Sequence, residues 1–346
     1  MQRYAPPVRS KDDAESMRGD LDTFGVTCVR VMDEESAQAA ALDVLGVLRR
    51  VRPDGVGADV PTPHGAKGCG FVPAYGHNQE EEVWRVRLNL SFREAQANLY
   101  GTTTTDLACS ADNVTYWGPD AARTKKPSAK VIGGGDAQKA FSAMTGSSLQ
   151  AHKDLGVGSH GAKFEAAMKE DKRILYPHSL QAQIVLKAVT ETGASIVISP
   201  DSLRLSEAES RTHFHPSTSD FCTLTKAGYE RLRETWIKVA PVPAGCAIIW
   251  RSDLVHANSK ADFGADPVRL GIFVTWHPRG FVPYDKKRKM ELVEQGFTST
   301  HWPFLTQRWR SPGSHMSNGK GLSKTIAKKE KKKYPEELRR RIEEAV

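Results

Sequence analysis

Residues 245–258 read Gly-Cys-Ala-Ile-Ile-Trp-Arg-Ser-Asp-Leu-Val-His-Ala-Asn, an apolar run that leads into a histidine. The run from Cys246 to Trp250 has the length and composition of a buried strand. His256 follows shortly after it, at the edge of the expected sheet. The segment therefore predicts a strand-rich core and makes His256 a candidate for site chemistry.

A second histidine lies upstream in His152-Lys153-Asp154, which has the form His-x-Asp. In an extended strand, residues i and i+2 point to the same face, so this imidazole and carboxylate can bind one metal ion together. His256, 102 residues after Asp154 (256 − 154 = 102), is the leading candidate for the third ligand. Two histidines and one carboxylate that leave open positions form the facial triad of non-haem iron(II) oxygenases.

Arg269 extends this pattern 13 residues after His256 (269 − 256 = 13), on an expected strand from Val268 to Trp276. A guanidinium there can bind the distal carboxylate of 2-oxoglutarate through two hydrogen bonds. Gly271, on the same face, would leave room for that co-substrate. The open metal positions would accept the 2-oxo acid and O2. A lone His-x-Asp is a weak signal, but its combination with His256 and Arg269 is much stronger.

Strand signals dominate between about residues 149 and 277, and 28 glycines and 19 prolines indicate many turns. A helical insert, Ala162 to Lys172, interrupts them, and Thr225 to Val239 also has a helical pattern. The fold predicted is mainly β (α+β). Its expected strands are Leu180 to Val189, Ala194 to Ile198, Cys246 to Trp250 and Val268 to Trp276.

The N-terminal third combines strands with helices. Residues 1–20 are polar and are predicted to be flexible, and Phe24 to Val31 is predicted to be a strand. Asp33 is expected to cap the helix that follows. Ser91-Phe-Arg-Glu94 is a capping-box pattern before a second helix, which Gly101 ends. Leu107 to Trp117 is a further strand region.

Residues from about 20 to 303 resemble the phytanoyl-CoA dioxygenase family, one of the Fe(II)/2-oxoglutarate-dependent oxygenase families. The resemblance implies a double-stranded β-helix (a jelly-roll, cupin-like core) with buttressing helices. It also makes Gln181 and Trp250 candidates for the substrate pocket. The segments that carry it, in the family's order, are Leu21 to Val29, Val83 to Arg87, Leu99 to Gly101, Asp106 to Asp112, His152 to Asp154, Leu180 to Leu186, Gly193 to Ser202, Gly245 to His256, Arg269 to Pro278 and Gly296 to Pro303.

Two features depart from the family's pattern. Pro200-Asp-Ser-Leu203 stands where Pro-Gly-Ser-His is usual, at a position that holds no ligand. The insert Gly158 to Arg173 lengthens the stretch after Asp154, as a lid over the substrate or a surface elaboration. The family nonetheless implies that His152, Asp154 and His256 bind Fe(II).

The implied activity is that of a dioxygenase which uses 2-oxoglutarate and O2 to hydroxylate a C–H bond of a small or lipid-like molecule, releasing succinate and CO2. Two alternatives stay open. One is an oxygenase of the same core that acts on nucleic acid or protein, with the basic tail as its anchor. The other is a non-catalytic β-barrel binding protein. A zinc site is a weaker interpretation, because such sites have closed His/Cys geometry.

Five further histidines compete for the metal. His160 and His178 flank the insert, and His213 and His215 lie in one short segment. Solvent or loop hydrogen bonding is the expected role of these four, and a structural role is expected for His277.

The bulk composition of the 346 residues, 39% hydrophobic and 26% charged, predicts a packed core. The five cysteines include no CxxC, which argues against a disulfide framework or a cysteine zinc site. No apolar run reaches membrane-spanning length and no signal-peptide pattern begins the chain, so a cytoplasmic protein is expected.

The net charge of +8 is concentrated in the tail, where Lys328 to Lys333 makes a nuclear location the alternative. The domain organisation predicted is a flexible 1–20, one oxygenase domain over 21–305 with its ligand-bearing barrel at about 149–278, and a basic linker and helix over 306–346. That helix should start near Pro335.

Overall fold

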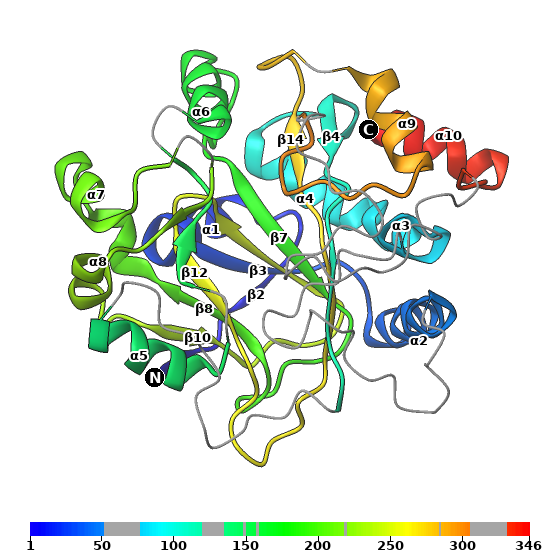
Figure 1. The fold of residues 1–346 in the computed structure, drawn as a ribbon. Helices are drawn as coiled ribbons and strands as arrows, with labels where there is room; N and C mark the ends of the chain where they lie inside the picture. The colour runs from blue at the N-terminus through cyan, green and yellow to red at the C-terminus, as the bar shows by residue number, and fades with distance from the viewer. Residues whose placement is uncertain are drawn as a thin grey trace.

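The computed structural model describes residues 1–51, 77–119, 135–147, 150–156, 159–217, 220–283, 285–304 and 331–346. Two six-stranded sheets lie face to face, and helices cover their outer sides (Figure 1). The fold is therefore mixed, with more helix than a mainly β chain would have. The predicted loop at 52–80 lies mostly outside the described residues, as do Lys125 to Pro127 and the linker at 311–323.

The first sheet carries the two histidines of the candidate site. Its strands are antiparallel except for β1, which pairs parallel with β10. In spatial order they are β1 (Gln2–Tyr4), β10 (Ile237–Val239), β8 (Ser195–Ser199), β12 (Val255–Ser259), β6 (His152–Lys153) and β9 (Cys222–Thr223).

The second sheet carries Arg269. Its order is β2 (Val8–Arg9), β3 (Val26–Arg30), β11 (Cys246–Arg251), β7 (Leu180–Val185), β13 (Arg269–Phe273) and β5 (Val114–Trp117). A separate two-stranded sheet joins β4 (Leu107–Cys109) to β14 (Trp276–Pro278).

Strand β11 shows why the strand sequences do not alternate between apolar and polar residues. Along β11, Ile248 and Trp250 point between the two sheets, whereas Ala247 and Ile249 point towards the helices. Both faces of this strand are buried, so alternation places every residue in one of two cores. The cluster between the sheets also takes Ile198 from the first sheet, which shows that the sheets pack against each other.

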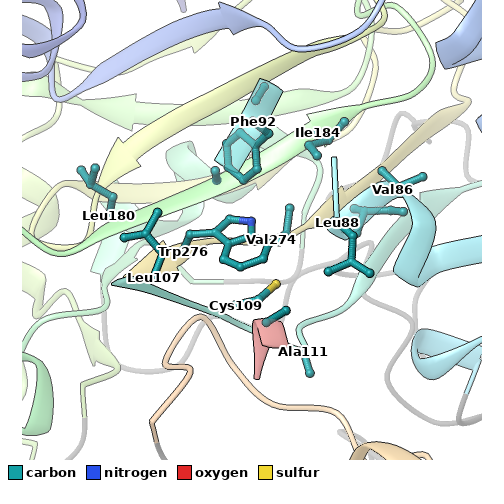
Figure 2. Packing of buried hydrophobic residues seen from close by; sticks show 14 of the residues in the cluster. Val86, Leu88, Phe92, Leu107, Cys109, Ala111, Leu180, Ile184, Val274 and Trp276 are labelled. Atoms are coloured by element: carbon teal, nitrogen blue, oxygen red, sulfur yellow. The ribbon is translucent and has the colours of Figure 1, made fainter. Parts of the chain in front are cut away.

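Helices cover the outer face of the second sheet, where the largest hydrophobic cluster lies (Figure 2). Trp276, Phe92 and Leu180 meet there from a strand, a helix and a second strand. The helices that contribute to this cluster are α1 (Ala14–Phe24), α2 (Glu34–Val51), α3 (Glu81–Arg87), α4 (Leu90–Tyr100), α6 (His160–Glu170), α9 (Lys286–Glu294) and α10 (Glu336–Ala345).

The outer face of the first sheet has its own cover. Phe141 of α5 (Gly135–Thr145) and Tyr229 of α8 (Lys226–Arg231) pack over Val197 and Val255. Helix α7 (Glu207–His213) lies beside α8. Short 3-10 turns complete the described elements: η1 (His77–Gln79), η2 (Thr104–Asp106) and η4 (Pro200–Arg204).

Several predicted boundaries are confirmed. The Asp33 carboxylate accepts a hydrogen bond from the Ser36 N–H at 2.6 Å, so it caps α2. Gly101 ends α4 with a φ of 72°, the left-handed conformation that favours glycine. The capping-box prediction for α4 was wrong, because Asn89, whose Oδ1 accepts from the Phe92 N–H, is the cap.

Two other predictions differ from the structure. Residues 1–20, predicted to be flexible, form β1, β2 and the first turns of α1, whose Met17 is fully buried. The helix predicted over Thr225 to Val239 ends as α8 at Arg231. Ile237 to Val239 instead forms β10, because its β-branched residues pair between β1 and β8.

The C-terminal helix α10 starts after Pro335, as predicted, and packs against the body of the protein. Leu338 and Ile342 are buried in the same cluster as Trp276. Basic side chains around it pair with acids: Lys332 with Glu80, and Arg339 with Glu294. The described part of the tail is therefore a component of the core.

Four cysteines, Cys28, Cys109, Cys222 and Cys246, are buried free thiols, and Cys69 lies outside the described residues. Among the helices described, none is long and apolar enough to cross a bilayer.

Candidate active site

The strand pairing brings His152 and His256 together. They are direct partners across the antiparallel pair β6–β12, and their ring centroids lie 4.5 Å apart. The sequence pattern placed His256 at the edge of the Cys246 to Trp250 strand. The structure places it inside a strand of its own, β12, in the opposite sheet.

Backbone carbonyls fix both imidazole rings. The Nδ1 of His152 bonds to the Gln150 carbonyl at 2.8 Å, and the Nδ1 of His256 bonds to the Leu254 carbonyl at 3.0 Å. Since a carbonyl only accepts, Nδ1 carries the proton and Nε2 keeps its lone pair.

Burial lowers the pKa of each of these imidazoles to about 4, and for His256 the neighbouring His152 lowers it further. Both rings are therefore neutral near pH 7, which is the form that binds metals.

Asp154 completes the cluster. Its Oδ2 lies 3.7 Å from the Nε2 of His152 and 3.5 Å from the Nε2 of His256. One ligand atom from each of the three residues lies within 4.8 Å of the others, the one such group in the chain as far as the structure describes it. The Nε2 amide of Gln181 donates to Oδ2 at 3.0 Å, so Gln181 orients the carboxylate.

Arg269 is a buried cation, with 3% of its surface exposed. It donates to the Asn258 Oδ1 at 2.8 Å and to the Gln183 Oε1 at 2.5 Å. Its Nε has no hydrogen-bond partner, and no carboxylate pairs with the guanidinium, within the described ranges. Burial lowers its pKa to about 9. A buried charge without a counter-ion is costly, so this environment is suited to an anion from outside the chain.

Position 271, beside Arg269, requires glycine because neighbouring atoms leave no room for a Cβ. A Cβ at this position would lie 2.4 Å from the Gln183 Nε2 and 2.7 Å from the Ile184 carbonyl oxygen. The space predicted to serve the co-substrate is thus used by Gln183, the side chain that accepts from Arg269.

Trp250 lies next to the histidines as part of the core between the sheets. Its ring centroid is 5.6 Å from that of His256 and 6.1 Å from that of Phe273. It is also the strand partner of Gln181 across β11–β7. Both pocket candidates therefore border the cluster, with Gln181 in contact with Asp154.

The competing histidines lie elsewhere. His160 is exposed at the start of α6, and His178 lies near Glu165, with 3.8 Å between its Nδ1 and the Glu165 Oε2. His213 and His215 are not part of the metal cluster. His277 is buried, and its Nε2 accepts from the Leu180 N–H at 3.3 Å, a structural contact.

Four residues at the site were not singled out from the sequence. Asn258 and Gln183 had a signal, since each is a polar residue two positions from another site residue on a strand. The ring of Phe221, 44% exposed, lies over His152 at a centroid distance of 4.4 Å. Burial lowers the pKa of His301, and the charges of Asp154, His256 and His152 also contribute to its shift. No pattern in the sequence marks Phe221, whereas His301 lies in the segment Gly296 to Pro303 that carries part of the family resemblance.

No protein-family model matches the chain, and neither does any curated protein. Solved structures do match this chain. The hypothetical protein JW0805 from Escherichia coli matches with a TM-score of 0.50 and 13% identity, over 88% of this chain and 81% of that chain. This likeness shows a shared overall fold.

Two further matches are non-heme enzymes. The epimerase SnoN, solved in complex with Fe3+, alpha ketoglutarate and nogalamycin RO, has a TM-score of 0.45 and 15% identity over 89% of this chain and 97% of that chain. The non-heme monooxygenase ThoJ, as its nickel complex, has a TM-score of 0.42 and 15% identity over 78% and 81%.

Proposed function

We propose that this chain is an Fe(II)- and 2-oxoglutarate-dependent oxygenase that hydroxylates a C–H bond of a small or lipid-like molecule. The proposal rests on two features that both lie between the same two sheets. One is a His-Asp-His cluster whose two Nε2 atoms can bind a metal, and the other is a buried arginine that pairs with no carboxylate among the described residues. In this proposal the facing sheets form a double-stranded β-helix.

The donor set fits iron(II). His152 and His256 each offer a neutral Nε2, and Asp154 offers Oδ2. Three protein ligands of this type leave positions for a co-substrate and O2. Gln181 holds the carboxylate in place, which is the role of outer contacts at metal centres.

The surroundings of Arg269 fit the distal carboxylate of 2-oxoglutarate. A guanidinium has five N–H donors, and Asn258 and Gln183 each accept one. These two amides fix the plane of the guanidinium. The remaining donors, including the unpartnered Nε, are available for a bidentate contact with a carboxylate.

When bound, iron, 2-oxoglutarate and O2 would supply the oxidation: one oxygen atom enters the substrate C–H bond, the other enters succinate, and CO2 leaves. The chain's own contribution is positional. Neutral imidazoles and one carboxylate hold the metal, Arg269 holds the co-substrate, and Trp250 and Phe273 help to exclude water from the space between them.

An anaerobic titration tests the proposal. Fe(II) and then 2-oxoglutarate are added to the purified protein, and the visible charge-transfer band of the chelate is recorded. The wild type should show the band, and Asp154→Ala should lose it while keeping the far-ultraviolet circular dichroism of the fold. His160→Ala, which removes an exposed histidine, is the matched control and should keep the band. A wild type without the band would refute the proposal.

A further inference from the structure

Asp154, the carboxylate of the metal cluster, is held at both its main chain and its side chain. Its N–H donates to the Ser252 carbonyl at 2.8 Å, and its Oδ2 accepts from the amide of Gln181 at 3.0 Å. Asp154 lies one residue past the end of β6, beyond the residues that pair with β12 and β9. Its main chain therefore depends on the bond to Ser252 for its position.

Ser252 is in turn held by the start of β7. Its N–H donates to the Ser179 carbonyl at 2.9 Å. This bond extends the β11–β7 ladder one step past the pair Arg251 and Leu180. Ser179 and Ser252 are both fully buried, and hydrogen bonds are electrostatically stronger in such surroundings than in water.

Glu165 of helix α6 binds the other side of the Ser179 peptide. Its Oε1 accepts from the Ser179 N–H at 2.7 Å, and 5% of Glu165 is exposed. Two basic groups lie farther from its Oε2: the Lys169 Nζ at 3.9 Å and the His178 Nδ1 at 3.8 Å. Three consecutive hydrogen bonds thus lead from the Glu165 carboxyl group to the main chain of Asp154.

Helix α6 is also anchored by contacts that do not involve Glu165. Phe164 and Met168 are buried in the hydrophobic cluster on the outer face of the second sheet. The Gly161 N–H donates to the Asp220 Oδ1 at 3.0 Å. A substitution of Glu165 should therefore remove one hydrogen bond without releasing the helix.

Resting on the proposed metal site, we propose that Glu165 is a positioning residue for Asp154. Its carboxyl group fixes the Ser179 peptide. That peptide holds Ser252, whose carbonyl binds the Asp154 N–H. Groups outside the ligand set orient the ligands of metal centres, and Glu165 does so through two peptide groups. The helix of the insert after Asp154 thus supports the metal centre.

Three substitutions separate the acceptor of Glu165 from the size of its side chain. Glu165→Gln keeps an acceptor for the Ser179 N–H, whereas Glu165→Met has a similar length and lacks a strong acceptor. Glu165→Asp keeps the charge but is one methylene shorter, and it is the second loss variant if Glu165→Met does not fold. Glu170→Met, at the exposed end of the same helix, is the matched control.

Co(II) alone is the probe, added to the full-length protein. It binds nitrogen and oxygen sites more tightly than Fe(II), and its visible absorption depends on the geometry of its ligands. Glu165→Met and Glu165→Asp should bind Co(II) about 2- to 30-fold more weakly than the wild type, the range for residues that act on a site without contacting its ligand. Their Co(II) absorption should also change in shape. Glu165→Gln and Glu170→Met should match the wild type in both measurements.

A double-mutant cycle tests whether the effect of Glu165 passes through Asp154. In an Asp154→Ala background, His152 and His256 still offer two nitrogen ligands to Co(II). Adding Glu165→Met there should leave the remaining affinity unchanged, because the carboxylate that Glu165 positions is gone. A loss of the same size in both backgrounds would reveal a general effect on the fold and overturn the inference.

The outcomes also separate this inference from the proposed metal site. A wild type that does not bind Co(II), or an Asp154→Ala variant that binds it as tightly as the wild type, overturns the metal site and this inference with it. Binding that depends on Asp154 but is the same in the wild type and in Glu165→Met overturns the role of Glu165 alone. A Glu165→Gln variant as weak as Glu165→Met does so too, because the acceptor would then not be the group that matters.

Discussion

His152 and His256 are direct partners in one antiparallel strand pair, although 104 residues separate them in the chain (256 − 152 = 104). Their rings lie 4.5 Å apart because opposite residues in an antiparallel pair point to the same face. The register of β6 against β12 therefore sets the separation of the two imidazoles that are proposed to bind the metal. A slip of one residue would turn one imidazole away from the other.

Replacing Arg269 should weaken the binding of 2-oxoglutarate and leave the binding of Fe(II) unchanged. Arg269→Leu removes the one charged side chain proposed to contact 2-oxoglutarate, and a charged hydrogen bond is worth about 1.5–3 kcal/mol. We expect the 2-oxoglutarate concentration at half-maximal chelate band to rise about 10- to 100-fold, with the Fe(II) requirement unchanged. Arg233→Leu, at an arginine with 62% of its side chain exposed, is the control. Equal changes in both requirements would contradict the assigned role.

Gln181 and Gln183 offer a matched pair on one face of β7. Gln181 donates to Asp154, whereas Gln183 accepts from Arg269. Gln181→Ala should weaken Fe(II) binding about 10- to 100-fold, as loss of an outer contact does, and should spare 2-oxoglutarate. Gln183→Ala should have the opposite selectivity. Titration of each variant with metal and then with co-substrate measures both, and an identical response of the two variants would refute this division.

Glu165 should make stability depend on pH. Burial, followed by the nearby Asp253 carboxylate, raises its pKa to about 7 from 4.5. Between these two values the folded protein holds a proton that the unfolded chain has released. The free energy of unfolding therefore falls as the pH rises from 4.5 to 7, by up to about 3 kcal/mol. Urea unfolding at pH 5 and pH 8 measures this contribution.

Glu165→Gln isolates that effect, because its amide oxygen can still accept from the Ser179 N–H. Relative to the wild type, the variant should be more stable at pH 8 than at pH 5. Glu170→Gln, at the exposed end of the same helix, is the control and should track the wild type. A Glu165→Gln difference that is the same at both pH values would show that the carboxyl group does not titrate in this range.

The C-terminal helix should contribute to global stability. Ile342 is fully buried in the cluster beneath α10, and truncation of such a side chain costs about 2–5 kcal/mol. Ile342→Ala should lower the unfolding midpoint in urea accordingly. Arg340→Ala, at a side chain 57% exposed on the same helix, should change it little. Similar midpoints for both variants would mean that α10 is not docked in solution.

The sequence predicted which residues cluster, namely His152, Asp154 and His256, better than it predicted the elements that surround them. The two ends of His-x-Asp are only two residues apart, although Asp154 lies just past the end of β6, and helix caps such as Asp33 and Gly101 depend on their immediate neighbours. These local features were recoverable from the chain alone. The helix predicted over Thr225 to Val239 failed because pairing with β1 and β8 outweighed the local preference of Ile237 to Val239.

The sequence by itself determined which groups can bind a metal and an anion: two histidines, an aspartate and an arginine in strand-forming surroundings. Only the tertiary structure decided that His152 lies opposite His256 and that Arg269 is buried with no carboxylate partner in the described part of the chain. The reason is physical. Residue type and spacing fix what a side chain can do and which face of its own strand it occupies, whereas its neighbours across a sheet depend on register and on contacts between distant segments.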